Sequence, residues 1–265
     1  MPPGDDDRAQ ARTLQRNLQA GGHDCAVEWV ESTASTNSDL LRQLRDGQEL
    51  AQCLVARHQS AGRGRRARPW IDEAAQDPGQ ALLCSLAWPL PRDCDLSGLS
   101  LMVGVCVVHA LQTVGLQGAG LKWPNDVLLR QRKLAGVLVE VCERPQARWI
   151  VAGIGLNLRS PAALPEAIGL HEAGVEVDRW QVLSALLPRL CFALREFAAT
   201  GFATWAQEWN RLHAWGQRPV QVLADAAAVV QGIAQGVDER GYLWLHTAEG
   251  SRRVGSGDVS LREDH

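Results

Sequence analysis

The sequence predicts an α+β protein in which a larger domain of helices and strands is followed by a small β-rich domain. Residues 38–213 contain both helical patterns and short apolar, β-like runs. Residues 218–262, in contrast, contain only short β-like runs broken by glycine, as in a small barrel. A chain of 265 residues is long enough for such a pair of domains. We therefore expect a partly flexible N-terminal extension (1–25), a main domain (26–215) and a C-terminal domain (216–265).

The N-terminal part of the chain contributes two short helices. Residues 8–20 predict one helix and leave no room for a helix-turn-helix DNA-binding domain in front of the rest. Residues 38–46 have apolar positions at a helical spacing, and Asn37 or Ser38 is expected to cap their start.

The rest of the main domain combines strands and helices. Its β-like runs lie at residues 53–57, 82–88, 126–129, 133–142 and 148–158. Residues 97–114 fit a helix with a buried face that Ser97 is expected to cap, and residues 178–213 predict two further helices. The β-like runs of the C-terminal domain lie at residues 219–224, 228–237, 241–247 and 252–257.

Composition and charge exclude several classes of protein. The formal net charge is −3, so no overall positive field would draw the chain onto nucleic acid or an anionic membrane. The seven cysteines are odd in number, lie far apart and include no C-x-x-C pair, which indicates free buried thiols. The segment MPPGDDDRAQ lacks the apolar core of a signal peptide, and the longest apolar run, 99–111, is too short to span a bilayer. We therefore expect a soluble, cytoplasmic protein.

Lysine is unusually rare in this chain. Of its 27 basic residues, only Lys122 and Lys133 are lysines, and they lie close together in the sequence. An ammonium group is a compact point donor, whereas a guanidinium is a wide planar fork. A chain this rich in arginine would use arginine wherever only a positive charge is needed, so we interpret the two lysines as required for the shape of the ammonium group. The alternative interpretation is that two surface lysines lie there by chance.

The segment GRGRRARPW (62–70) predicts an anion-binding loop. It combines two glycines with four arginines and no carboxylate: Arg63, Arg65, Arg66 and Arg68. Because like charges repel, we expect the loop to be mobile when empty and to be ordered by an anion such as phosphate. The glycines let backbone N–H groups approach such a ligand closely. The alternative is a solvated basic turn. A nucleic-acid site would need further basic patches of comparable density, and the sequence offers none.

Two segments place charged groups near turns or strand ends. In LKWPNDVLL (121–129), Asp126 is either an ordinary turn residue or a carboxylate directed into a pocket as a base or acceptor. In KLAGVLVE (133–140), the Lys133 ammonium is expected at the mouth of a strand, and Gly136 would let a ligand lie against the backbone.

Two further segments offer uncharged groups. The segment GIGLNL ends a β-like run and contains Gly153, Gly155 and Asn157. It lacks the third glycine and the following helix of a dinucleotide-binding turn, so a bulge in a strand is the ordinary interpretation. In the segment STASTNSDLL, three polar residues come just before a predicted helix: Ser35, Thr36 and Asn37. These residues either cap the helix or offer two hydroxyls and an amide to a neutral polar group.

Together, STN, GRGRRARPW, KWPND, KLAGVLVE and GIGLNL resemble the biotin protein ligases in their order and spacing. The resemblance runs from about residue 28 to the C-terminal DVSLR. It implies a mixed β-sheet flanked by helices, akin to class II aminoacyl-tRNA synthetases, and a small SH3-like C-terminal barrel. It also implies a two-step reaction, in which biotin and MgATP give biotinyl-5′-AMP and pyrophosphate. A lysine of a biotin carboxyl carrier domain, in acetyl-CoA carboxylase or a related carboxylase, then takes the biotin.

The resemblance also implies roles for the matched residues. Ser35, Thr36 and Gln59 would bind the ureido head of biotin. Lys133 would reach the biotin carboxylate and the α-phosphate, and Asp126 would take the proton from the acceptor lysine. The implied biotin site is Ser35, Thr36, Asn37, Gln59, Gly62, Arg63, Gly64, Arg65, Lys133 and Gly136. The implied ATP site is Arg65, Arg68, Trp70, Lys122, Asn125, Lys133, Asn157 and Arg262. The implied catalytic residues are Lys133, Arg65, Asp126 and Lys122.

Several residues depart from the family pattern. Ala67 stands where the loop usually has glycine and Pro69 where a basic residue is common, which would reduce loop mobility. Residues 159–169, which should cover adenine, contain no aromatic side chain, so Ile168 or Leu164 would take that place. The DNA-binding domain of the bifunctional repressor ligases is missing, so we expect no transcriptional role.

Three other functions stay open. Lipoate and octanoyl ligases or transferases share the core fold and modify similar carrier domains, although the Arg-rich loop and KWPND argue against them. A module that holds biotin without turnover would be stabilised by biotin but would label no carrier. The acidic balance makes nucleic-acid binding the least favoured function. The family includes both monomers and homodimers, so the sequence leaves the oligomeric state open.

Overall fold

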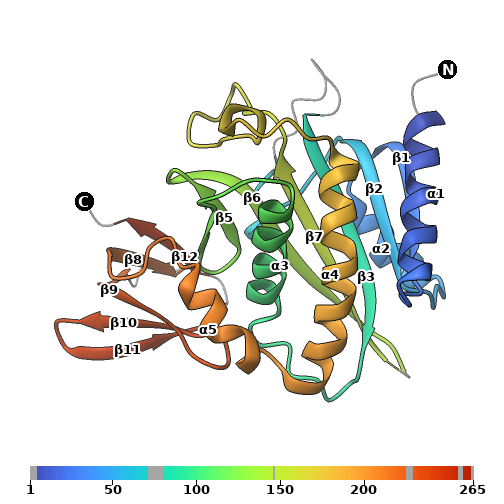
Figure 1. Ribbon diagram of the computed structural model, residues 1–265. Helices are drawn as coiled ribbons and strands as arrows, with labels where there is room; N and C mark the ends of the chain where they lie inside the picture. Colours follow the sequence, from blue (N-terminus) through green and yellow to red (C-terminus); the bar gives the residue numbers. More distant parts are fainter. Residues whose placement is uncertain (1–4, 71–79, 146, 225–228, 256–258, 264–265) are drawn as a thin grey trace.

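The protein contains two β-sheets, one large and one small (Figure 1). The structure is a computed structural model that describes residues 5–70, 80–145, 147–224, 229–255 and 259–263. The large sheet has seven strands in the order β1-β2-β3-β7-β6-β5-β4, and the small sheet has five in the order β11-β10-β9-β8-β12. The predicted α+β class, with a mixed sheet flanked by helices and a small C-terminal β domain, is therefore confirmed.

The large sheet is mixed. Its strands are β1 (Ala26–Thr33), β2 (Gln52–Gln59), β3 (Ala81–Leu90), β4 (Gly120–Lys122), β5 (Asp126–Leu129), β6 (Arg132–Glu143) and β7 (Arg148–Asn157). β1 and β2 pair in parallel, whereas all other neighbours in this sheet pair antiparallel. The helices are α1 (Asp5–Ala20), α2 (Thr36–Arg45), α3 (Leu99–Thr113), α4 (Arg179–Thr200) and α5 (Ala203–Arg211). Short 3-10 turns lie at Arg65–Ala67 and His171–Ala173.

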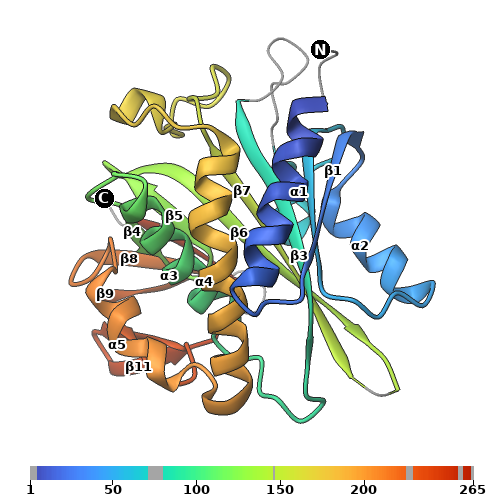
Figure 2. The same ribbon diagram turned by 45° about the vertical axis from the view of Figure 1, so that its right-hand side comes forward.

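Alternating apolar residues of the central strands supply two hydrophobic cores. Cys84 and Leu86 of β3 face the larger core, which α1, α3 and α4 cover. Leu54 of β2 and Ala87 of β3 face the smaller core, which α2 covers on the opposite side of the sheet (Figure 2). Because α2 is short and covers only part of that side, the neighbouring ends of β6 and β7 are left available for a pocket.

The helix predicted at 38–46 begins earlier, and its predicted cap is wrong. α2 starts at Thr36, and Ser35 is its N-cap, with the Ser35 Oγ accepting a hydrogen bond from the Ser38 N–H at 3.5 Å. An N-cap residue needs an extended backbone, which Ser35 has, whereas Asn37 and Ser38 are already helical.

The cap predicted for the next helix is also wrong. α3 begins at Leu99 after Gly98, which has a φ of 78° and makes no side-chain cap, and Ser97 lies outside the helix. A Cβ atom on Gly98 would lie 2.3 Å from the ring of Phe202. Close packing of Gly98 against Phe202, just before α5, therefore determines where α3 begins.

The small sheet follows α5 and contacts it directly. Its strands are β8 (Pro219–Ala224), β9 (Val229–Val237), β10 (Leu243–Thr247), β11 (Gly250–Val254) and β12 (Val259–Glu263). The Asn210 side chain accepts a hydrogen bond from the Val237 N–H at 2.7 Å and donates to the Val237 carbonyl at 2.9 Å. The buried Trp123 indole donates to the Gly241 carbonyl at 3.1 Å, which joins the two sheets near the start of β5.

All seven cysteines are buried free thiols, as the sequence predicts. Burial raises the pKa of the Cys106 thiol to about 12, which keeps it protonated and unreactive. Among the described helices, none has the length and apolar character needed to cross a bilayer.

Candidate active site

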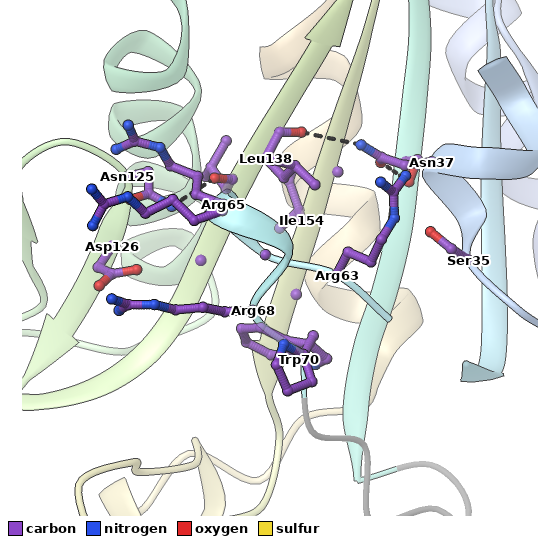
Figure 3. Close-up of a pocket in the computed structure, with 18 of the residues that line it drawn as sticks. Ser35, Asn37, Arg63, Arg65, Arg68, Trp70, Asn125, Asp126, Leu138 and Ile154 are labelled. Carbon is purple, nitrogen blue, oxygen red and sulfur yellow. Dashed lines mark hydrogen bonds between the residues drawn. The ribbon is translucent and has the colours of Figure 1, made fainter. Parts of the chain in front are cut away.

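A cavity of about 230 Å³ lies where the flap meets the ends of β6 and β7 (Figure 3); we call residues 62–70 the flap. Fourteen of the predicted site residues line this cavity: Ser35, Thr36, Asn37, Gln59, Arg63, Gly64, Arg65, Arg68, Trp70, Lys122, Asn125, Asp126, Lys133 and Gly136. Figure 3 shows Arg65, Arg68 and Asp126 at one end and Ser35 and Asn37 at the other. Segments far apart in the sequence therefore form one site with two different ends. Lysine, arginine and aspartate side chains lie at the charged end. Hydroxyl and amide side chains, beside the Arg63 guanidinium, lie at the other end, which we call the uncharged end.

Glycines of β7 leave the space that the cavity needs. A Cβ atom on Gly153 would lie 2.3 Å from the Asn37 Oδ1 atom, and one on Gly155 would lie 2.6 Å from the Trp70 ring. β7 pairs without interruption through both positions, so the bulge that the sequence left open is absent there. These two glycines instead let side chains from α2 and the flap lie directly on the sheet.

The uncharged end is built around the start of α2. The Thr36 backbone N–H donates to the Gln59 Oε1 atom at 2.7 Å, and the Thr36 hydroxyl lies 3.0 Å from the same oxygen. The Thr36 hydroxyl also lies 2.6 Å from the Ser85 hydroxyl, which donates to the Asn37 Oδ1 atom at 2.5 Å. Ser85 is fully buried in β3 and was not predicted as a site residue. The one signal for it is a single hydroxyl within the apolar run LLCSLAW.

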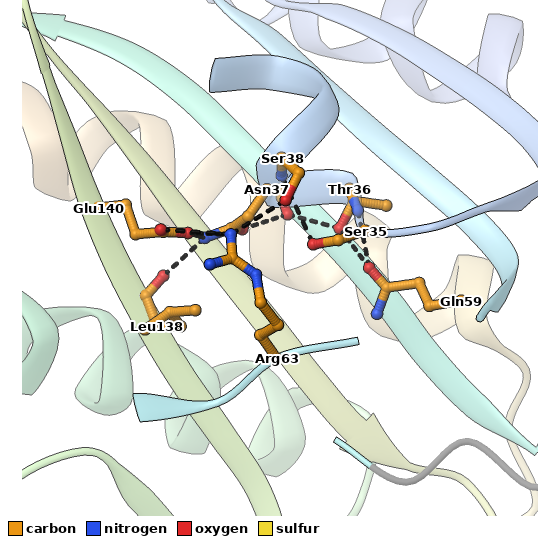
Figure 4. A network of polar contacts seen from close by, with 9 residues as sticks. Ser35, Thr36, Asn37, Ser38, Gln59, Arg63, Leu138 and Glu140 are labelled. Carbon is orange, nitrogen blue, oxygen red and sulfur yellow. Dashed lines mark hydrogen bonds and ion pairs between the residues drawn. The ribbon is translucent and has the colours of Figure 1, made fainter. Parts of the chain in front are cut away.

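Glu140 connects this end to the flap (Figure 4). Its Oε2 atom accepts a hydrogen bond from the Asn37 amide at 2.8 Å, and both carboxylate oxygens lie 3.4 Å from the Arg63 guanidinium. The same guanidinium donates to the Ser38 hydroxyl at 2.9 Å. Glu140 is the last residue of the segment KLAGVLVE but was not predicted as a site residue. The periodicity of the segment does not reveal which distant side chains its carboxylate would contact.

Backbone hydrogen bonds close the flap on itself. The Trp70 N–H donates to the Gly62 carbonyl at 2.9 Å, and the Gly64 N–H donates to the Arg68 carbonyl at 2.8 Å. Arg66 has a φ of 58° at the turn between them, in the left-handed region where a non-glycine residue is uncommon. Gly62, which was predicted to bind biotin, is buried and does not line the cavity. A Cβ atom there would lie 3.1 Å from the Gln59 amide nitrogen, so the flap passes close to Gln59 at this position.

Lys133 and Asp126 form an ion pair in the cavity wall. The Lys133 Nζ atom lies 2.7 Å from the Asp126 Oδ1 atom and 5.6 Å from the centre of the Trp70 ring. Asp126 begins β5 and pairs with Gly136 of β6, so the turn of KWPND places its carboxylate beside a lysine of the neighbouring strand. Asp126 is the one carboxylate among the described residues that line the cavity.

The remaining predicted residues have mainly structural contacts in this structure. The Asn125 amide donates to the Val137 carbonyl at 2.9 Å, which holds the turn to β6. The Asn157 amide donates to the Lys133 and Ile168 carbonyls at 3.3 and 3.4 Å, and Asn157 is buried outside the cavity lining. Arg262 lies in β12, and its side chain is outside the described part of the structure.

Lys122 lies over an aromatic ring at the junction with the C-terminal segment. Its Nζ atom is 4.3 Å from the centre of the Trp215 ring. β4, which carries Lys122, is fixed by backbone hydrogen bonds from Leu121 to Leu212 and from Ala214 to Leu121. His213 lies between these two contacts, and burial lowers the pKa of its imidazole to about 4. Within the described residues, neither His213 ring nitrogen has a hydrogen-bond partner.

Two parts of the flanking structure bear on ligand contacts. Ile168, one of two residues expected to cover adenine, is buried in the larger core, and Leu164 is half-buried. Across the described residues, His, Cys, Asp and Glu side chains form no group of three or more that could hold a metal ion.

Comparison with known proteins agrees with this geometry. Residues 29–157 match the Biotin/lipoate A/B protein ligase family, and residues 217–262 match the Biotin protein ligase C terminal domain. The chain is 34% identical over 268 residues to a biotin--[acetyl-CoA-carboxylase] ligase of Mycobacterium tuberculosis, in an alignment that covers 96% of this chain and 98% of that protein. It is 31% identical over 249 residues to the bifunctional ligase/repressor BirA of Escherichia coli, covering 91% of this chain and 75% of that protein.

The fold comparison gives the same result. A biotin protein ligase from Aquifex aeolicus, solved in complex with biotin and ATP, superimposes with a TM-score of 0.76 at 28% identity. The superposition covers 90% of this chain and 99% of that one. Sequence identity, coverage of both domains and the shared fold together place this chain in the biotin protein ligase family.

Proposed function

We propose that this protein activates biotin with MgATP and transfers it to a lysine of a biotin carboxyl carrier domain, in acetyl-CoA carboxylase or a related carboxylase. The observation that carries the proposal is the Lys133–Asp126 pair, 2.7 Å apart, in a cavity that the arginine-bearing flap covers. One cavity thus combines a cation for an acyl phosphate with a carboxylate for an attacking amine.

The uncharged end of the cavity fits the ureido head of biotin. A ureido group has one carbonyl acceptor and two N–H donors, and it carries no charge. Ser35, Thr36 and Gln59 offer two hydroxyls and an amide at this end, and Thr36 is already fixed by its backbone hydrogen bond to Gln59. Hydroxyl and amide groups satisfy such a head without the cost of burying an unpaired charge.

The charged end fits the carboxylate of biotin and the α-phosphate of ATP. A biotin carboxylate oxygen would attack the α-phosphorus, forming a P–O bond while the bond to pyrophosphate breaks. Negative charge builds up on the phosphoryl oxygens in this step, and the Lys133 ammonium with the Arg65 and Arg68 guanidiniums would offset it. Gly64 would let the flap backbone approach the same group, and Gly136 would let biotin lie against β6.

The second step needs a base. The acceptor lysine has an ordinary pKa near 10.4, so its amine is protonated at neutral pH and must lose a proton to attack. Asp126 would accept that proton as the C–N bond forms and the acyl–phosphate bond breaks, with AMP leaving. A water-poor cavity would protect the reactive anhydride from hydrolysis between the two steps.

The nucleotide would extend away from the uncharged end. Lys122 and Asn125 line the cavity beside Asp126, and Trp70, whose ring centre lies 5.6 Å from the Lys133 Nζ atom, offers an aromatic face. Asn157 and Arg262 are proposed on the nucleotide side by resemblance. Magnesium would enter as part of the substrate MgATP.

The domains and setting of the reaction are proposed on the same basis. Residues 26–215 would act as the catalytic domain and residues 216–265 as an SH3-like domain that supports the nucleotide side, with 1–25 as a partly flexible extension. We propose a cytoplasmic enzyme, monomeric or homodimeric, that acts on biotin, ATP and a carrier protein and not on nucleic acid or membranes.

Intact-protein mass spectrometry tests this function. The protein is incubated with MgATP, a biotin carboxyl carrier domain and either biotin, lipoate or octanoate. The proposal predicts that the carrier gains the biotinyl mass on one lysine, and that omitting ATP abolishes the gain. A lipoyl or octanoyl adduct would favour the related ligases instead. Thermal stabilisation by biotin without any adduct would indicate a binding module.

A further inference from the structure

We propose that Glu140 is a positioning residue that holds the flap closed over the bound acyl-adenylate. This inference rests on the proposed function, because it assigns to Glu140 a part in retaining the intermediate of that reaction. Glu140 does not line the cavity, so it would act through the residues that it holds.

Three separate elements meet at the Glu140 carboxylate (Figure 4). Glu140 itself comes from β6, Asn37 comes from α2, and Arg63 comes from the flap. The Asn37 amide donates to the carboxylate at 2.8 Å, and the Arg63 guanidinium lies 3.4 Å from both of its oxygens. Together with the Arg63 hydrogen bond to the Ser38 hydroxyl at 2.9 Å, these contacts join the flap to α2 and β6 (Figure 4).

The same carboxylate belongs to a continuous series of hydrogen bonds that runs from the uncharged end of the cavity to the flap. The series runs through Gln59, Thr36, Ser85, Asn37, Glu140 and Arg63. Its inner members, Thr36, Asn37 and Ser85, are at most 4% exposed, so their hydrogen bonds have little competition from water. The position of the flap arginine is thereby linked to the residues proposed to bind the head of biotin.

The charge of Glu140 matters because two donors approach it. An ionised carboxylate is acceptor-only and can satisfy both the Asn37 amide and the Arg63 guanidinium. A glutamine of the same shape has one acceptor oxygen, and its NH₂ group would face a donor. Glu140→Gln should therefore leave the fold intact while it releases either Arg63 or Asn37.

The test is the rate at which biotinyl-5′-AMP leaves the enzyme. The wild type and Glu140→Gln are loaded with biotin and MgATP, freed of excess ligand, and chased while the released adenylate is measured. We expect release to be about fivefold faster in Glu140→Gln, the size expected for loss of a partly exposed charged contact. Glu143→Gln is the matched control, since it makes the same change on β6 and breaks a 2.7 Å contact with Arg148 away from the cavity. Its release rate should equal that of the wild type.

A double-variant cycle separates positioning from general loosening of the fold. If Glu140 acts by holding Arg63, Glu140→Gln should accelerate release far less in an Arg63→Ala background than in the wild type. An equal acceleration in both backgrounds, or a release rate unchanged by Glu140→Gln, would overturn the proposal. A wild-type enzyme that forms no adenylate would instead refute the proposed function. Thermal melting of every variant shows whether a change in release reflects unfolding.

Discussion

The Lys133 Nζ atom lies 2.7 Å from the Asp126 Oδ1 atom, across the pairing of β5 with β6. Lys133 is one of only two lysines among the 27 basic residues of the chain. In the proposed reaction the two groups act in different steps, the ammonium on the phosphate and the carboxylate on the acceptor amine. Their contact implies that the ammonium must turn toward the adenylate before the carboxylate is available as a base.

Lys133→Arg tests whether the shape of this cation matters. A Cβ atom on Gly136 would lie 3.2 Å from the Lys133 Nζ atom and 3.3 Å from Trp70, so the ammonium lies close against the backbone of β6 and against Trp70 on that side. A planar guanidinium cannot take the place of a point donor there. We expect biotin-dependent ATP–pyrophosphate exchange to fall about 100-fold or more, the usual cost of losing a charge-stabilising donor. Near-normal exchange would mean that charge alone suffices at this position.

Asp126→Asn should separate the two steps of the reaction. Asparagine keeps the shape of aspartate but cannot take a proton from the acceptor amine. We expect transfer from purified biotinyl-5′-AMP to the carrier lysine to fall about 100-fold or more, as for loss of a general base. Adenylation, followed by pyrophosphate exchange, should change much less. Equal losses in both steps would assign Asp126 to holding Lys133 rather than to proton transfer.

Gly155→Ala should damage the cavity without unfolding the protein. The new methyl group would lie 2.6 Å from the Trp70 ring, which is half-buried and must therefore shift within the cavity. We expect the KM for ATP to rise about tenfold or more, because small displacements of binding groups are costly. Gly216→Ala is the control, since its methyl group would have no neighbour closer than 3.5 Å. An unchanged KM for ATP in Gly155→Ala would show that Trp70 does not bound the nucleotide site.

His213 should make stability depend on pH. Burial lowers its pKa from 6.5 to about 4, so between these values the unfolded chain binds a proton that the folded protein does not. Stability is therefore full above pH 6.5 and falls as the pH drops toward 4, by up to about 3 kcal/mol. Urea unfolding of the wild type and His213→Leu at several pH values measures this contribution. The same pH dependence in both proteins would contradict it.

Much of the fold was predictable because the spacing of apolar residues along the sequence reflects which face of each helix or strand is buried. The strand runs 82–88 and 148–158 and the helix at 97–114 correspond to β3, β7 and α3 within a few residues. The sequence does not predict β1, β4 or β12. β1 is an edge strand with interspersed charged residues, and β4 has three residues, so neither carries a strong alternating pattern.

The site was predictable where a motif concentrates unusual residues and unpredictable where a single residue completes a network. Arg65, Asp126 and Lys133 stand out in short segments and line the cavity. Ser85 and Glu140 do not stand out, because each depends on partners that are distant in sequence. Helix caps failed for a similar reason, since close packing between distant segments decides where α3 begins.

Biotin-dependent ATP–pyrophosphate exchange by the wild-type protein tests most directly the claim that this cavity makes an acyl-adenylate. With labelled pyrophosphate and no carrier protein, the label should enter ATP when biotin is present and not when lipoate or octanoate replaces it. Exchange that is absent with biotin, or that appears with lipoate or octanoate instead, would contradict the account.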